Sequence, residues 1–92
     1  MNADTVCSEF EIKNVQGLHA RPASLFVQTA SSFKSEITVE KDGEMINGKS
    51  LMGLLMLCAG IGTVLKVTAK GPDSQEAMGA LKSLVDGKFG ED

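Results

Sequence analysis

Hydrophobic and polar residues alternate in three stretches of the chain, and a period of two is typical of strands with one buried face. These stretches are residues 6–13, 36–41 and 64–70. The side chains expected on the buried faces are Val6, Ser8, Phe10, Ile12, Ile37, Val39, Leu65, Val67 and Ala69. The pattern therefore predicts three strands, each with its polar side chains directed toward solvent.

Two further stretches, residues 20–32 and 74–88, carry hydrophobic residues at the spacing of one helix face. The expected buried positions are Ala23, Phe26, Val27, Ala30, Ala77, Leu81, Leu84, Val85 and Phe89. Residues 51–58 are hydrophobic almost throughout and follow Ser50, a favourable helix N-cap residue. We predict a short helix there, between two amphipathic ones.

A hairpin completes the order of elements. Asp42 and Gly43 form a strong turn signal, which predicts a returning strand over residues 44–47. The resulting order is β-α-β-β-α-β-α, and alternating strands imply a sheet with one face in water and helices on the other. We expect a two-layer α+β sandwich in which the last strand lies between the first and second, antiparallel to both.

Length and charge place the chain among soluble globular proteins, with one domain over residues 1–92. The net charge is −3, and no cluster of Lys or Arg resembles a nucleic-acid footprint or a membrane-binding patch. The longest hydrophobic stretch, residues 51–61, is too short to span a bilayer. Residues 1–5 show no secretory signal, so we expect a cytoplasmic protein without membrane insertion.

The cysteines and the histidine give no sign of a metal site. Cys7 and Cys58 form neither a metal motif nor a disulfide framework, and we expect both to be reduced, buried thiols. His19 is the only histidine and has no second ligand at metal-binding spacing. Neither a metal nor any other cofactor is expected.

His19 lies where a loop is predicted to enter the first helix. Histidine can act as a nucleophile near neutral pH, and a helix start offers unpaired N–H groups and a positive dipole end that suit a phosphate. Arg21 could clamp that phosphate, and Gly17 permits close approach and an unusual backbone angle. Pro22 is tolerated in the first helical turn. We expect His19 to carry a phosphoryl group.

Two motifs make the sequence recognisable. Residues 17–23 read Gly-Leu-His-Ala-Arg-Pro-Ala, and residues 47–53 read Asn-Gly-Lys-Ser-Leu-Met-Gly. They resemble the active-site signature and the regulatory serine segment of the HPr family, the histidine-containing phosphocarriers of the bacterial phosphoenolpyruvate:sugar phosphotransferase system. The resemblance runs over residues 6–89. It implies an open-faced β-sandwich, with a four-stranded antiparallel sheet and three helices on one face.

The resemblance also implies a carrier that serves sugar transport and is not itself an enzyme. His19 would accept a phosphoryl group from phosphorylated enzyme I on Nδ1 and pass it to an EIIA-type domain, with Arg21 steadying the phosphate. A kinase/phosphorylase acting on Ser50 and a transcriptional regulator are further partners that the family admits. We expect a monomer.

Ser50 has two interpretations that the sequence leaves open. It reads as an N-cap, and by resemblance it is a regulatory site where a phosphate would add about two negative charges beside a hydrophobic surface. Leu51, Met52 and Leu55 follow on a helix too hydrophobic to bury every side. We expect them to form an exposed contact patch together with Leu18; the alternative is that such residues belong to the core.

Two other functions compete with the carrier. One is a regulatory protein-binding module of a nitrogen-related or catabolite-control branch, which would dock through Leu51, Met52 and Leu55 without carrying phosphate. The intact His-Ala-Arg-Pro run argues against it, because a docking module does not need that site. The other is a small hydrolase, disfavoured because no paired carboxylates or activated nucleophile stand out.

Overall fold

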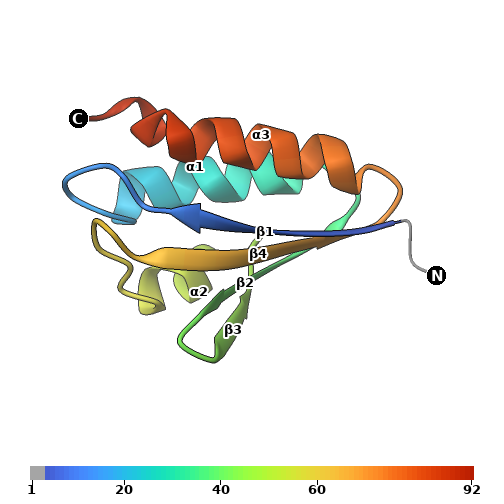
Figure 1. Ribbon diagram of the computed structural model, residues 1–92, viewed down its shortest axis with the longest axis horizontal. Coiled ribbons are helices and arrows are strands. Elements are labelled where there is room, and N and C mark those ends of the chain that lie inside the picture. Colours follow the sequence, from blue (N-terminus) through green and yellow to red (C-terminus); the bar gives the residue numbers. More distant parts are fainter. Residues whose placement is uncertain (1–3) are drawn as a thin grey trace.

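A computed structural model describes residues 4–92 as a four-stranded sheet with helices (Figure 1). Residues 1–3, part of the segment considered above for a secretory signal, lie outside the described residues. The elements are β1 (Thr5–Glu11), α1 (Ala20–Ser31), β2 (Glu36–Lys41), β3 (Glu44–Asn47), α2 (Leu51–Met56), β4 (Val64–Lys70) and α3 (Ser74–Asp86). The predicted order of elements is confirmed. None of the helices within residues 4–92 is long and hydrophobic enough to cross a membrane.

The strands lie in the order β1-β4-β2-β3, and every neighbouring pair is antiparallel. The chain leaves β1, crosses through α1 and returns as β2 two positions away, and β4 fills the space between them, as predicted. The register pairs Phe10 with Leu65 and Val39 with Val67. Because paired residues point to the same side of a sheet, one face collects the hydrophobic side chains.

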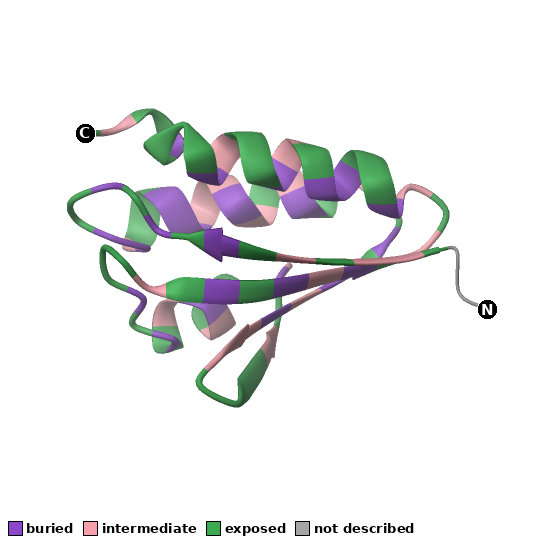
Figure 2. Cartoon of the chain, viewed as in Figure 1, coloured by how far each residue is buried: buried purple, intermediate pink, exposed green. Residues whose placement is uncertain are grey.

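The core lies between this hydrophobic face and the helices, and α1 and α3 run side by side along it (Figure 2). Its largest fully buried side chains are Phe26, Phe89, Ile12, Leu54, Leu57, Leu65 and Leu81. The opposite face is polar and exposed, as at Glu9 and Lys66, which are paired in the register. The open-faced α+β sandwich is thereby confirmed.

The third helix is shorter than predicted, because the backbone adopts left-handed dihedral angles after it. The α3 helix ends at Asp86, and Lys88 and Phe89 then adopt the left-handed region, with φ of 57° and 55°. This turn directs the Phe89 ring into the core, where it is 1% exposed. The predicted buried position is therefore correct, although Phe89 lies after α3, in a short 3-10 turn (Lys88–Gly90) that contains these left-handed angles.

Both cysteines are free and exposed, so the expectation of buried thiols is wrong. Cys7 lies opposite Thr68 on the uncovered face of the sheet. Strand alternation places it there, whatever the preference of a cysteine side chain for the interior. Cys58 follows the end of α2 in a left-handed conformation with φ of 52°, which turns the chain out of the helix.

Candidate functional site

His19 begins α1 with its backbone and leaves its ring available. It is the N-cap residue, with extended backbone angles of φ −83° and ψ −168°, and its carbonyl accepts a hydrogen bond from the Ala23 N–H at 2.9 Å. Its side chain makes no capping hydrogen bond to the first turn within the described residues. The side chain is 38% exposed. The ring therefore lies at a helix N-terminus and within reach of a second molecule.

The loop before His19 is held by close backbone packing. Gly17 has φ of 73°, and a Cβ atom on it would lie 2.6 Å from the Ala59 carbonyl oxygen and 2.8 Å from the Gly60 Cα. The same Ala59 carbonyl accepts a hydrogen bond from the Leu18 N–H at 2.8 Å. Only glycine satisfies both the angle and the space, so the loop after α2 sets the position of the histidine loop.

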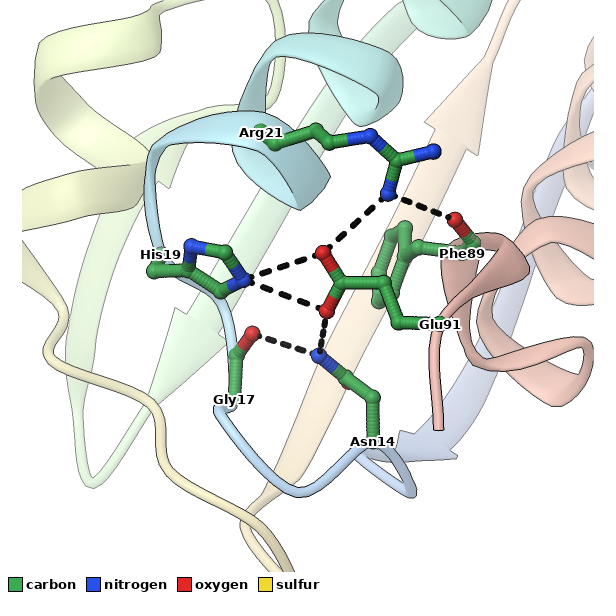
Figure 3. A network of polar contacts seen from close by, with 6 residues as sticks. All are labelled: Asn14, Gly17, His19, Arg21, Phe89 and Glu91. Carbon is green, nitrogen blue, oxygen red and sulfur yellow. Dashed lines mark hydrogen bonds and ion pairs between the residues drawn. The ribbon is translucent and has the colours of Figure 1, made fainter.

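A carboxylate from the far end of the chain occupies the site (Figure 3). Both Glu91 side-chain oxygens lie 3.1 Å from His19 Nε2. Arg21 Nη1 donates to Glu91 Oε2 at 3.1 Å and to the Phe89 carbonyl at 3.2 Å. A carboxylate oxygen only accepts, so the contact with His19 requires the proton on Nε2. The two residues expected to handle a phosphate thus bind an anionic group in this state.

Asn14 ties this carboxylate to the histidine loop. Its Nδ2 donates to the Gly17 carbonyl at 2.7 Å and to Glu91 Oε1 at 3.0 Å. The side chain is 0% exposed, and its Oδ1 has no hydrogen-bond partner within residues 4–92. A single buried amide therefore spans the loop and the C-terminal segment, which we define as residues 87–92.

The site favours negative charge. The hydrogen bond from His19 lowers the pKa of Glu91 below that of an ordinary glutamate, the contacts with Asn14 and Arg21 act in the same direction, and burial opposes them. Glu91 is therefore ionised at neutral pH. Donors that hold a carboxylate in this way also suit the oxygen atoms of a phosphoryl group.

Sequence reasoning missed Glu91 and Asn14. The sequence alone assigns no role to either residue, although Glu91 and Asp92 are acidic. Glu91 and His19 are 72 positions apart, so no local spacing connects them. A usable signal is Phe89, a hydrophobic residue beyond the end of α3 that must turn back to be buried. This turn brings the residues after it to the site.

Ser50 caps α2. Its backbone is extended, and its Oγ accepts the hydrogen bond of the Gly53 N–H at 3.0 Å. The N-cap interpretation is confirmed. The side chain is half-buried, and its hydroxyl lies directly before the hydrophobic residues of the helix.

The surface of α2 exposes part of the expected patch. Met52 is 68% exposed, Leu51 is 38% exposed and Leu55 is half-buried. Leu18 is only 5% exposed and packs in the core, so its expected place among the exposed residues is corrected. Met56 is 66% exposed, and the sequence did not single it out. A helix turn faces residues 52, 55 and 56 outward while Leu54 points inward.

A shallow hollow connects this surface with the histidine. Leu55 and Cys58 line it together with His19, and the buried Leu18 forms part of its wall. Leu55 of α2 thus lines one hollow with the ring of His19, and Leu51 and Met52 lie one helical turn before Leu55. We call the surface formed by His19, Leu51, Met52, Leu55, Met56 and Cys58 the histidine face.

Comparisons with known proteins agree on one family. A family model described as "PTS HPr component phosphorylation site" matches residues 6–86. The phosphocarrier protein HPr of Neisseria meningitidis is 54% identical over 81 residues, which are 88% of this chain and 91% of that protein. The crystal structure of HPr from Thermoanaerobacter tengcongensis matches with a TM-score of 0.91 and 53% identity, covering 95% of this chain and 98% of that one.

A regulatory relative is also similar. Crh of Bacillus subtilis, whose crystal structure is a domain-swapped dimer, matches with a TM-score of 0.73 and 45% identity, covering 85% of this chain and 90% of that one. These matches span nearly the whole sequence and agree with the expected family, and the phosphocarrier function is supported over the binding module. The chain therefore belongs to the HPr family and is a phosphocarrier protein of the phosphotransferase system, not an enzyme.

Proposed function

We propose that His19 carries the phosphoryl group on Nδ1, accepting it from phosphorylated enzyme I and passing it to an EIIA-type domain. The observation that supports this most is the engagement of Nε2 by Glu91. A neutral ring with its proton on Nε2 has its free electron pair on Nδ1. The acceptor atom is then the nitrogen that the carboxylate leaves free.

The transfer follows from this arrangement. The Nδ1 electron pair attacks phosphorus, a nitrogen–phosphorus bond forms, and the bond to the donor breaks with its electron pair left on the donor. Charge on the phosphoryl oxygens would be stabilised by the start of α1, where the N–H groups of Ala20 and Arg21 have no helical partner. Such fixed donors contribute most where charge develops in the transition state.

Arg21 is the second part of the proposal. Its side chain is 58% exposed, and its guanidinium donates hydrogen bonds to Glu91 and to the Phe89 carbonyl. An incoming phosphoryl group carries more negative charge than a carboxylate, so it would compete for the same donors. Arg21 would then exchange Glu91 for the phosphate and hold it by charge-assisted hydrogen bonds.

The histidine face is the proposed docking surface for enzyme I, for EIIA-type domains and for a regulator. Exposed methionines such as Met52 and Met56 suit a surface that meets several partners. Phosphorylation of Ser50 by a kinase/phosphorylase would control access to this surface.

We further propose that the protein acts in the cytoplasm as a monomer. Size-exclusion chromatography, with the domain-swapped dimer of its relative as the reference, would test the oligomeric state.

The test of His19 is phosphotransfer from phosphoenolpyruvate with purified enzyme I. We expect an acid-labile mass gain of about 80 Da, the mass of one phosphoryl group, on the unaltered protein and no gain on His19→Ala. A gain that persists on the His19→Ala variant, or no gain on either protein, would contradict the proposal.

A further inference from the structure

We infer that Glu91 is a positioning residue for His19: its carboxylate holds the imidazole with the proton on Nε2 and the electron pair of Nδ1 directed to the incoming phosphoryl group. This inference rests on the proposed role of His19 as the acceptor. It adds a partner for the ring nitrogen that does not react. Glu91 itself forms no bond with phosphorus.

The contact between Glu91 and His19 uses both carboxylate oxygens, and this fixes the direction of the ring N–H. Both Glu91 oxygens lie at the same distance of 3.1 Å from Nε2 (Figure 3). A carboxylate centred on one N–H in this way restrains rotation of the ring as well as its tautomer. The Glu91 side chain is only 19% exposed, half the exposure of the His19 side chain, so the carboxylate is the better fixed of the two.

Three anchors fix the carboxylate from the other side. The buried Asn14 amide donates to Oε1 at 3.0 Å. The Phe89 ring is buried in the core two residues earlier, after the left-handed turn. One residue later, the Asp92 carbonyl accepts a hydrogen bond from the Val15 N–H at 2.8 Å. The chain is therefore fixed both before and after Glu91, the residue that contacts His19.

This arrangement has a chemical consequence during transfer. When Nδ1 bonds to phosphorus while Nε2 keeps its proton, the ring gains one positive charge, and the donor keeps the electron pair of the broken bond. A carboxylate on the Nε2 proton stabilises that positive ring, as the aspartate of a Ser-His-Asp triad stabilises its imidazolium. The proton stays on Nε2 throughout the step. Loss of the carboxylate charge would therefore slow transfer in both directions.

The variant Glu91→Gln tests this with little change of shape. The matched control is Asp92→Asn, which removes the same charge one position away and leaves intact the Asp92 carbonyl that binds Val15. The first readout is the nitrogen-15 NMR shift of the two ring nitrogens in the unphosphorylated protein, which needs no partner. We expect Nδ1 to have the shift of a bare ring nitrogen in the unaltered protein and in Asp92→Asn, and to move toward the tautomer-averaged shift in Glu91→Gln.

The second readout is the rate of phosphoryl transfer from enzyme I. We expect the transfer rate to fall roughly tenfold in Glu91→Gln, which is less than the loss in a buried triad because this pair is partly in water. In Asp92→Asn the rate should fall less than about twofold. Unchanged ring shifts in Glu91→Gln, an unchanged rate, or an equal loss in Asp92→Asn would each overturn the inference. Failure of the proposed function would appear separately, as phosphorylation that survives His19→Ala.

Discussion

At the scale of single residues, the site consists of donors arranged around one anion. His19, Arg21 and Asn14 come from one loop and the helix it enters, and all three contact Glu91. The anion they hold is a side chain of the same molecule. Exchange of Arg21 from this carboxylate to a phosphoryl group, with Glu91 kept on Nε2 of His19, is therefore the residue-scale event on which the proposed function depends.

The Arg21→Ala variant is expected to slow transfer without weakening the fold. Within residues 4–92 the guanidinium forms hydrogen bonds only with Glu91 and the Phe89 carbonyl, and the side chain is mostly exposed, so its removal should change the free energy of unfolding by less than about 1 kcal/mol. The transfer rate should fall roughly 10–100-fold, because a donor to the developing charge is lost. Rapid-quench kinetics and urea unfolding measure the two effects. A loss of stability large enough to explain the rate would contradict the assignment.

The Gly17→Ala variant is expected to destabilise the protein through both backbone angle and contact. Its φ is positive, and its Cβ would collide with the Ala59 carbonyl. Gly43→Ala is the matched control, since Gly43 also has a positive φ of 83° but has open space around it. Urea unfolding should show a loss of about 1 kcal/mol in the control and about 2–3 kcal/mol in Gly17→Ala. Equal losses would mean that the contact with the α2 loop is unimportant.

At the scale of elements, one side chain ties the start of α3 to the loop after α1. Asp73 directly precedes α3, and within the described residues its side chain makes no capping hydrogen bond to that helix. Its carboxylate accepts hydrogen bonds from the Ser35 hydroxyl at 2.6 Å and from the Ser35 and Lys34 N–H groups at 3.0 and 2.9 Å. Asp73 thus joins the connection between α1 and β2 to the start of α3.

This junction predicts a pH dependence of stability. The hydrogen bond from the Ser35 hydroxyl, followed by that from the Lys34 N–H, lowers the pKa of Asp73 in the folded state. A lowered pKa contributes stability that is complete above the pKa of an unfolded aspartate and is lost as the pH falls through the folded value. Urea unfolding between pH 6 and about 2 should therefore show a weaker acid loss in Asp73→Asn. An unchanged acid profile in this variant would contradict the junction.

Ser50→Asp is expected to weaken transfer by charge alone. Both aspartate and asparagine are good N-caps, so Ser50→Asn is a control that keeps the cap of α2 without the charge. The two variants should unfold within about 0.5 kcal/mol of each other. Transfer from enzyme I should fall roughly tenfold in Ser50→Asp, equivalent to about 1.4 kcal/mol of docking energy, and stay near the unaltered rate in Ser50→Asn. An equal loss in both would assign the effect to the helix cap.

At the scale of the whole molecule, the sheet order brings distant segments together at one end. The loop between β1 and α1, the C-terminal segment and the loop after α2 meet around His19. The polar face of the sheet and the histidine face lie on different sides of the core. The two exposed cysteines report on them separately, because Cys7 lies on the sheet face and Cys58 on the histidine face.

Selective alkylation should therefore distinguish the two faces. Treatment of Cys7→Ser with N-ethylmaleimide modifies Cys58, and the bulky group should slow transfer from enzyme I by roughly tenfold, about 1.4 kcal/mol of docking energy. The matched protein, Cys58→Ser alkylated at Cys7, should transfer at nearly the unmodified rate. Slower transfer only after modification of Cys7 would move the docking surface to the open face of the sheet.

Local patterns predicted most of the architecture. Alternation, helical spacing and turn or cap residues depend only on neighbouring residues, and together they located the four strands and three main helices. Most positions predicted as buried lie in the core, but Val6, Val27 and Leu84 are only partly buried against it. The prediction was less reliable where tertiary contacts compete with residue type. Leu18 is hydrophobic and next to His19, but the hydrogen bond of its N–H to Ala59 holds it against the core. The prediction of buried thiols at Cys7 and Cys58 was wrong because their exposure depends on the sheet face and on the turn after α2, not on the residue type.

The sequence by itself determined the element order, the family and the loop that holds His19 and Arg21, because each of these is written in contiguous residues. The tertiary structure alone decided what these two residues face. Glu91 reaches His19 across 72 positions only because Phe89 must be buried and the backbone reverses hand to do so. Contacts between segments far apart in the chain depend on how the whole core closes, and no local pattern carries that information.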